Sequence, residues 1–155
     1  MKAPLKKMLS LESIPEQGRF GGKRKFDTHT GVDLYCEPGT PVYAMEDGVV
    51  VSVEYFTGTN AQSPWWHDTK AVTIEGVSGV ILYGEVETSL KAGDRVSEGQ
   101  EIAKVVQVLK NDKGLPMTML HLELYKLGYK GSGEWWKETQ PEDLLDVETI
   151  LRKVE

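Results

Sequence analysis

One imidazole and one carboxylate lie close together near the start of the chain, in the run His29-Thr30-Gly31-Val32-Asp33, and a second imidazole, His121, lies far downstream. Imidazole nitrogen and carboxylate oxygen are ligands that zinc accepts, and three protein ligands leave one further position open, as in catalytic zinc sites. The sequence therefore predicts a zinc centre held by His29, Asp33 and His121. The alternative is that His29 and Asp33 belong to a turn and that His121 is an exposed strand residue.

The segment that carries His121 has the pattern of a β-strand. Leucines occupy every second position, which places them together on one face: Leu120, Leu122 and Leu124. Met119, His121, Glu123 and Tyr125 then share the opposite face. We expect Glu123 to lie beside His121, where its carboxylate could orient the imidazole.

The elements that must position these residues read as short strands. β-Branched and apolar residues fill the segments 41–44, 48–55, 71–75 and 79–86, and residues typical of turns separate them. The pattern predicts a mainly β fold with an antiparallel sheet, sandwich or barrel. Proline and acidic residues at 141–143 predict one or two short helices in the tail. Trp135 and Trp136, just before the tail, are expected to be packing anchors.

Composition narrows the function classes. The 155 residues carry a formal net charge of −6, which argues against nucleic acid or an anionic membrane as the main partner. Cys36 is the only cysteine, so an intrachain disulfide is impossible. The chain has no apolar run of the kind found in signal peptides or membrane spans, so we expect it to be cytoplasmic, with non-classical export or release as an open alternative.

A glycine-rich, basic segment at 18–25 precedes His29. It is either a flexible turn with solvated charges or a loop that lines the metal cleft.

Several motifs follow one another in order between Gly18 and Tyr125. They are Gly18-Arg19-Phe20-Gly21 through His29-Thr30-Gly31-Val32-Asp33-Leu34, then Gly39-Thr40-Pro41-Val42-Tyr43-Ala44 with Asp47-Gly48-Val49-Val50, then Ala92-Gly93-Asp94-Arg95-Val96 and Glu98-Gly99-Gln100-Glu101-Ile102-Ala103, and last His121-Leu122-Glu123-Leu124. In this order they resemble the motifs of the lysostaphin-type zinc endopeptidases, which cut peptide cross-links in bacterial cell walls.

The resemblance implies a fold and a ligand set. The fold would be an antiparallel β-sheet with an open groove, and His29, Asp33 and His121 would hold zinc. The domain organisation that follows is an N-terminal lead-in at 1–17, a peptidase-like zinc domain at 18–130, and a C-terminal helical extension at 131–155 packed on the same domain.

Two positions depart from the family pattern. The family usually has His-x-His in its last motif, with the first histidine catalytic, and Met119 stands at that place here. The family also usually has Tyr-x-His in a middle strand, where this chain has Tyr83-Gly84-Glu85. The resemblance thus implies an intact metal shell in which both proton-handling histidines are replaced.

Glu85 and His67 are the candidates to replace the missing histidines. Glu85 could serve as general base, could bind zinc as a fourth ligand, or could be a strand residue that faces solvent. His67, in the polar loop before residue 69, is either a second candidate or an exposed loop histidine.

Two functional hypotheses follow. In the first, hydrolysis is impaired or lost, and the groove binds a peptide, a cell-wall-like glycan or a protein partner. In the second, the protein is an active zinc peptidase that uses Glu85 as its base.

Overall fold

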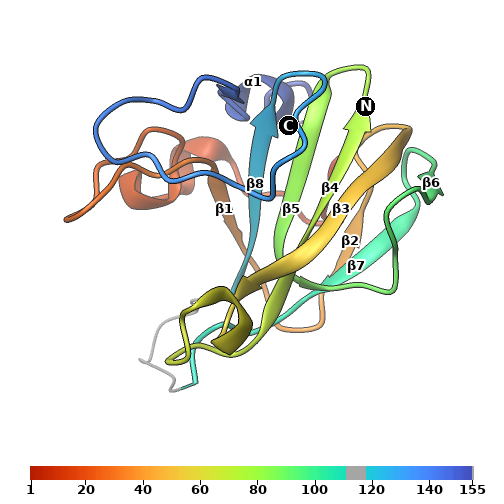
Figure 1. Cartoon of the computed structure of the whole chain (residues 1–155). Coiled ribbons are helices and arrows are strands. Elements are labelled where there is room, and N and C mark those ends of the chain that lie inside the picture. Colours follow the sequence, from red (N-terminus) through yellow and green to blue (C-terminus); the bar gives the residue numbers. More distant parts are fainter. Residues whose placement is uncertain (111–117, 155) are drawn as a thin grey trace.

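The computed structural model describes residues 1–110 and 118–154. These residues form a nine-stranded antiparallel sheet with the order β1-β8-β5-β4-β3-β6; β7 joins β5 and β2, and β9 joins β8. Figure 1 shows β8, β5, β4 and β3 side by side at the centre of the molecule. The predicted mainly β, antiparallel fold is confirmed.

The strands are β1 (Val32–Tyr35), β2 (Pro41–Tyr43), β3 (Gly48–Thr57), β4 (Thr69–Gly76), β5 (Gly79–Glu87), β6 (Arg95–Val96), β7 (Glu101–Val105), β8 (Met119–Tyr125) and β9 (Leu144–Leu145). The helical elements are the 3-10 turns η1 (Leu11–Ser13), η2 (Glu16–Gly18) and η3 (Thr59–Ala61) and the α-helix α1 (Glu148–Leu151). In the described part of the chain, no helix is both long and apolar enough to span a membrane.

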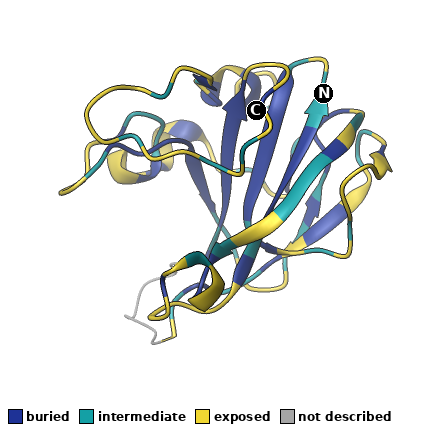
Figure 2. Ribbon diagram, in the orientation of Figure 1, coloured by how far each residue is buried: buried dark blue, intermediate teal, exposed yellow. Residues whose placement is uncertain are grey.

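Strand β8 is covered on both faces. Its leucines pack in the main core, as their period-two spacing predicts. The opposite face is also buried: His121 is only 6% exposed and Glu123 only 2%. Figure 2 shows this burial along the central strands. The alternative of an exposed strand histidine is therefore wrong.

The tail differs in part from the expected helices. Leu144 and Leu145 form strand β9, which pairs with Tyr125 and Leu124 of β8, and only 148–151 are α-helical. β1 pairs with β8 only as far as Leu122, so pairing of β9 with the end of β8 satisfies backbone groups that a helix at these residues would have satisfied internally.

The two tryptophans before the tail also behave differently from each other. Trp136 packs against Phe20, with ring centroids 5.4 Å apart, as expected of an anchor. Trp135 is 75% exposed, so the expectation that it is a packing anchor is wrong. A bridge between Thr28 and Trp136 ties this segment to the N-terminal segment, and the two run side by side in Figure 1.

Candidate metal centre

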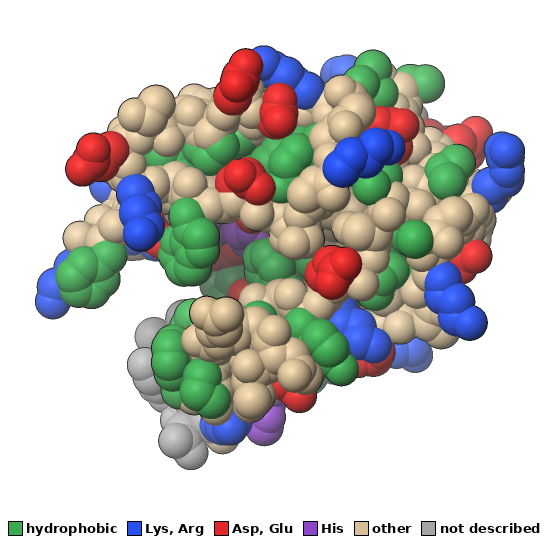
Figure 3. All heavy atoms as spheres, viewed as in Figure 1, with side chains coloured by type: hydrophobic (Ala, Val, Ile, Leu, Met, Phe, Trp, Pro, Cys, Tyr) green, Lys and Arg blue, Asp and Glu red, His purple; other side chains and the backbone are tan. Residues whose placement is uncertain are grey.

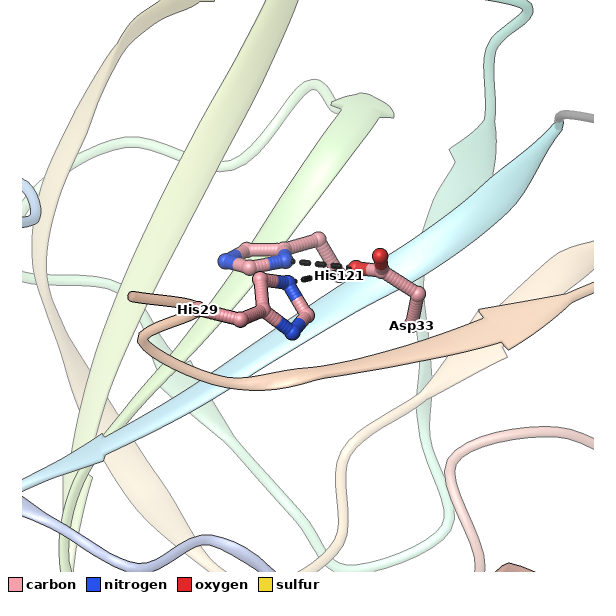
Figure 4. Close-up of side chains that lie close together, drawn as sticks. All are labelled: His29, Asp33 and His121. Carbon is pink, nitrogen blue, oxygen red and sulfur yellow. Dashed lines mark hydrogen bonds and ion pairs between the residues drawn. The ribbon is translucent and has the colours of Figure 1, made fainter. Parts of the chain in front are cut away.

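Antiparallel pairing of β1 and β8 brings the predicted ligands together. Asp33 on β1 is the direct register partner of His121 on β8, and His29 lies in the loop just before β1. Asp33 Oδ1 lies 3.1 Å from His29 Nε2 and 2.8 Å from His121 Nδ1 (Figure 4). One ligand atom from each of the three buried residues lies within 4.8 Å of the others. The structure thus assembles the three residues that the sequence singled out.

In each imidazole, the nitrogen that does not face Asp33 has its own hydrogen-bond partner. His29 Nδ1 lies 3.0 Å from the Arg19 carbonyl oxygen, which can only accept, so Nδ1 carries the proton and Nε2 faces Asp33 as a lone pair. His121 Nε2 lies 2.6 Å from Glu123 Oε2 and donates to it, which leaves Nδ1 toward Asp33. When both imidazoles are neutral, two lone pairs and a carboxylate oxygen converge on one point, and such a set of acceptors needs a cation between them. The donor set therefore fits zinc.

The contacts within the cluster shift the pKa values of His121 and Asp33 in opposite directions. Burial alone would lower the pKa of His121, but hydrogen bonds to Asp33 and Glu123 raise it well above its usual value. Burial would raise the pKa of Asp33, but its contacts with the imidazoles of His121 and His29 bring it far below its usual value. In the metal-free protein a proton on His121 therefore balances the Asp33 carboxylate, and a metal ion would compete with this proton.

Glu123 is held firmly against His121. Its Oε2 also accepts a hydrogen bond from Thr30 Oγ1 at 2.7 Å, and its Oε1 accepts one from the Tyr125 hydroxyl. These donors fix the carboxylate, and the carboxylate in turn fixes the imidazole ring. Glu123 lies where the sequence predicted it, and the positioning role stays a prediction.

The basic segment before β1 also contacts the cluster. Arg24 Nη2 lies 3.3 Å from Asp33 Oδ2, the carboxylate oxygen that does not face the histidines, and it also donates to the Gln17 carbonyl. Arg24 and Lys25 line the cleft beside the centre. Of the two alternatives for this segment, the cleft-lining loop is correct. The role of Arg24 could not be found from sequence, because lysine and arginine neighbours there look alike.

Glu85 lies at an irregular point of β5. The register between β4 and β5 passes from the pair Val72–Tyr83 to the pair Lys70–Val86, so two residues, Gly84 and Glu85, stand opposite one. This is a β-bulge, which turns a side chain away from the regular alternation. Glu85 there has a φ of 64°, a left-handed conformation that is rare for a residue with a side chain.

The bulge turns the Glu85 carboxyl inward. The residue as a whole is half-buried, but its Oε2 is buried and meets no hydrogen-bond donor among the described residues, so the carboxyl does not extend into bulk solvent as the third alternative required. Burial raises the pKa of this carboxyl to about 8. Glu85 and Met119 both line the cleft that holds the three predicted ligands.

His67 is not brought to the centre. Its side chain is exposed, it is absent from the residues that line the cleft, and its backbone N–H donates to the Val108 carbonyl. The structure therefore supports the exposed loop histidine and gives no geometric basis for His67 as a proton-handling residue.

The cleft has a volume of about 910 Å³. Four tryptophans line it, namely Trp65, Trp66, Trp135 and Trp136, and these are all the tryptophans in the sequence. Figure 3 looks into this hollow, where histidine atoms lie at the floor between hydrophobic side chains on two sides. The opening is large enough for a drug-sized ligand or a short peptide.

Comparison with known proteins identifies the family. The sequence model of Peptidase family M23 matches residues 27–133, which include the three predicted ligands and both Glu85 and Met119. No curated protein sequence matches the chain.

Several solved structures have a similar fold. A mutant catalytic domain of the prophage-encoded M23 protein EnpA from Enterococcus faecalis is 26% identical, with a TM-score of 0.54 over 77% of this chain and 84% of that chain. The catalytic domain of the antimicrobial peptidase lysostaphin from Staphylococcus simulans is 18% identical, with a TM-score of 0.58 over 87% of this chain and 89% of that chain. A zinc containing peptidase from Vibrio cholerae is 24% identical, with a TM-score of 0.53 over 79% of this chain and 36% of that chain. The family match covers more than half of the sequence, and this chain belongs to Peptidase family M23.

Proposed function

We propose that this protein is a zinc-binding member of the family in which hydrolysis is impaired or lost and the cleft serves to bind a peptide or cell-wall-like ligand. One observation carries the proposal: the complete donor set of His29, Asp33 and His121 stands beside Met119 and Glu85, where the family usually has two histidines. The predicted metal shell is thus retained, while both proton-handling residues are replaced.

The residues around the centre offer little for proton transfer. Bound zinc would supply Lewis acidity toward a carbonyl oxygen. The thioether of Met119 has no proton to donate, and it cannot stabilise an oxyanion by a strong hydrogen bond. Loss of one oxyanion donor costs about 10²–10³ in rate, and loss of general acid–base help costs about 10²–10⁴. Losing both functions would leave little turnover.

The lining of the cleft supports a binding role. Trp65 is 63% exposed and Trp135 is 75% exposed, although large aromatic side chains normally avoid such exposure. Exposed aromatic groups around a concave site are typical of ligand-binding surfaces. A peptide segment with apolar side chains, or a sugar ring with its apolar face, would bury them.

The deciding experiment measures metal content and cleavage together. We expect about one zinc per chain in the wild type by elemental analysis, and a loss of that zinc in His121→Ala. We also expect no zinc-dependent cleavage of cell-wall cross-link peptides by the wild type, and a gain of cleavage when Met119→His and Glu85→His are combined. Efficient zinc-dependent turnover by the wild type would refute the loss of hydrolysis, and absence of zinc after reconstitution would refute the metal centre.

An active hydrolase is the second candidate, and the inward-facing Glu85 carboxyl favours it. In that case Glu85 would take the proton that a histidine takes in other members of the family. The test is Glu85→Gln: turnover should disappear while the zinc content stays the same. Unchanged turnover in this variant would exclude Glu85 as the base.

A further inference from the structure

Glu85 combines two features that each cost free energy. Among the described residues, its Oε2 is the one buried side-chain oxygen or nitrogen without a hydrogen-bond partner. Its backbone is held at a φ of 64° by the bulge in β5, and the Glu85 carbonyl accepts from the Val106 N–H on the neighbouring segment. A strained backbone conformation and a buried carboxyl oxygen without a hydrogen-bond partner occur at the same residue. Together they indicate that the Glu85 side chain binds a ligand.

The surroundings of Glu85 identify the chemistry of that ligand. Gly84, the residue before it, pairs with His121 across the β5–β8 ladder, so the bulge directs Glu85 toward the strand that carries a predicted zinc ligand. The charged groups that act on its carboxyl are His121, Asp33 and Arg24, all at the metal centre. Arg24 is already engaged by Asp33 and by the Gln17 carbonyl, so a cation is the partner that the Glu85 carboxylate lacks.

Charge balance supports the same conclusion. With both imidazoles neutral, a divalent ion and the Arg24 guanidinium bring three positive charges to the centre, and the carboxylates of Asp33 and Glu123 offset two of them, so one positive charge remains. A third carboxylate makes the centre neutral, and burial of charge is costly unless it is compensated.

We propose that Glu85 is a fourth protein ligand of the zinc centre, so that the loaded site is closed to exogenous ligands. Among the described residues, the ligand atoms within 4.8 Å of one another come from His29, Asp33 and His121, so Glu85 would join them by rotation of its side chain when the ion enters. This inference rests on the proposed zinc centre. It would also give a reason for the proposed loss of hydrolysis, because a closed site cannot polarise a substrate carbonyl.

The first test uses the wild-type protein and needs no variant. Cobalt(II) replaces zinc in such sites, and its visible absorption changes when an added anion binds to it. We expect the cobalt-loaded wild type to keep its spectrum when azide is added. A spectral shift with saturable azide binding would show an open position and overturn the proposal. A protein that binds neither zinc nor cobalt would refute the proposed metal centre itself, which is a separate and recognisable result.

The second test compares zinc affinities in three variants by competition with a chelator. Glu85→Gln should weaken zinc binding by more than the roughly 10- to 100-fold that loss of an outer hydrogen-bond partner costs. Glu123→Gln removes such an outer partner, so it should stay within that range and leave the cobalt site closed to azide. Glu87→Gln removes the same charge two residues further along β5, where Glu87 pairs with Lys70 at the surface, and it should leave the affinity unchanged.

A fourth variant tests the closed site directly. Cobalt-loaded Glu85→Ala should acquire azide binding that the wild type lacks, because the substitution vacates one position. An unchanged zinc affinity in Glu85→Gln, with circular dichroism like that of the wild type, would mean that Glu85 does not bind the ion.

Discussion

Asp33 contacts three basic side chains, and its two carboxylate oxygens are divided between them. Arg24 occupies one carboxylate oxygen, while His29 and His121 both face the other. The Arg19 carbonyl and the Glu123 carboxylate then determine which nitrogen each imidazole presents. At the residue scale, the groups that orient the three candidate ligands are therefore as important to the proposed metal centre as the ligands themselves.

Glu123 gives a test of this control of orientation. Glu123→Gln keeps the size of the side chain but removes the carboxylate that accepts from His121 Nε2. We expect zinc to bind about 10- to 100-fold more weakly, because the imidazole is less firmly held and less basic. Chelator competition measures the change. The exposed Glu138 supplies the control, and Glu138→Gln should bind zinc like the wild type. Equal affinities in both variants would contradict the positioning role.

Glu85 gives a pH dependence in the metal-free protein. Its folded pKa of about 8 lies above the usual value of 4.5, so between these values the folded state holds a proton that the unfolded state has released. The free energy of unfolding therefore falls as the pH rises from 4.5 to 8. The pKa of His121 is also raised, so above pH 6.5, its ordinary pKa, His121 further lowers the free energy of unfolding as the pH rises.

Glu85→Gln isolates the contribution of the glutamate, since His121 is retained. We expect the metal-free variant to be more stable than the wild type by about 1–3 kcal/mol at pH 8, the usual cost of a buried polar group without a partner. The difference should shrink toward pH 5. Urea unfolding in the presence of a chelator at both pH values measures it, and a difference that does not change with pH would contradict the raised pKa.

At the scale of elements, the C-terminal helix holds the loop that carries the first ligand. Glu148 of α1 accepts from Arg19 Nη2 at 2.7 Å and Arg19 Nε at 2.9 Å, and also from the Phe20 backbone N–H. The carbonyl of the same Arg19 accepts from His29 Nδ1. A two-pronged ion pair at the end of the chain thus fixes the backbone that orients a predicted zinc ligand.

Glu148→Gln should show this connection. Arg19 and backbone hydrogen bonds lower the pKa of Glu148, so its contribution to stability is present above about 4.5 and is lost as the pH falls through its folded pKa. At pH 7 we expect the variant to lose about 1–2 kcal/mol, since solvent screens part of the pair. Thermal unfolding measures the loss, with Glu142→Gln at an exposed position as control. Equal stability of both variants at pH 7 would show that the ion pair contributes nothing.

At the scale of the whole molecule, the cleft is formed by segments that lie far apart in sequence. Trp65 and Trp66 come from the loop between β3 and β4, Trp135 and Trp136 come from the segment after β8, and the metal centre lies between β1 and β8. Intrinsic fluorescence therefore reports on this one cleft, because every tryptophan of the chain lines it.

A substitution at Trp135 should affect ligand binding without affecting stability. Because its side chain is 75% exposed, Trp135→Ala should change the free energy of unfolding by no more than about 0.5 kcal/mol. If the cleft binds soluble cell-wall peptide fragments, the same variant should bind them about 10-fold more weakly, as loss of an exposed aromatic anchor usually does. Fluorescence titration measures the affinity. Val77→Ala, at an exposed residue that does not line the cleft, should bind normally. Equal affinities would remove Trp135 from the binding surface.

The sequence by itself determined most of the strands and named the three candidate metal ligands. Period-two alternation around the leucines of β8 and turn residues between apolar segments depend only on neighbours in the chain, so β2, β3, β4, β5 and β8 lie where they were predicted. The trio could be named because His29 and Asp33 are close in sequence and His121 is one of only three histidines.

Only the tertiary structure decided what surrounds these residues. The bulge that turns Glu85 inward arises from a mismatch between two strands, and no local pattern reveals it. Leu144 and Leu145 form a strand because β1 leaves the end of β8 unpaired, and His67 and Trp135 are exposed because no element covers them. Register, strand edges and burial depend on contacts between distant segments, so a single sequence names the candidates and the folded chain determines which of them meet.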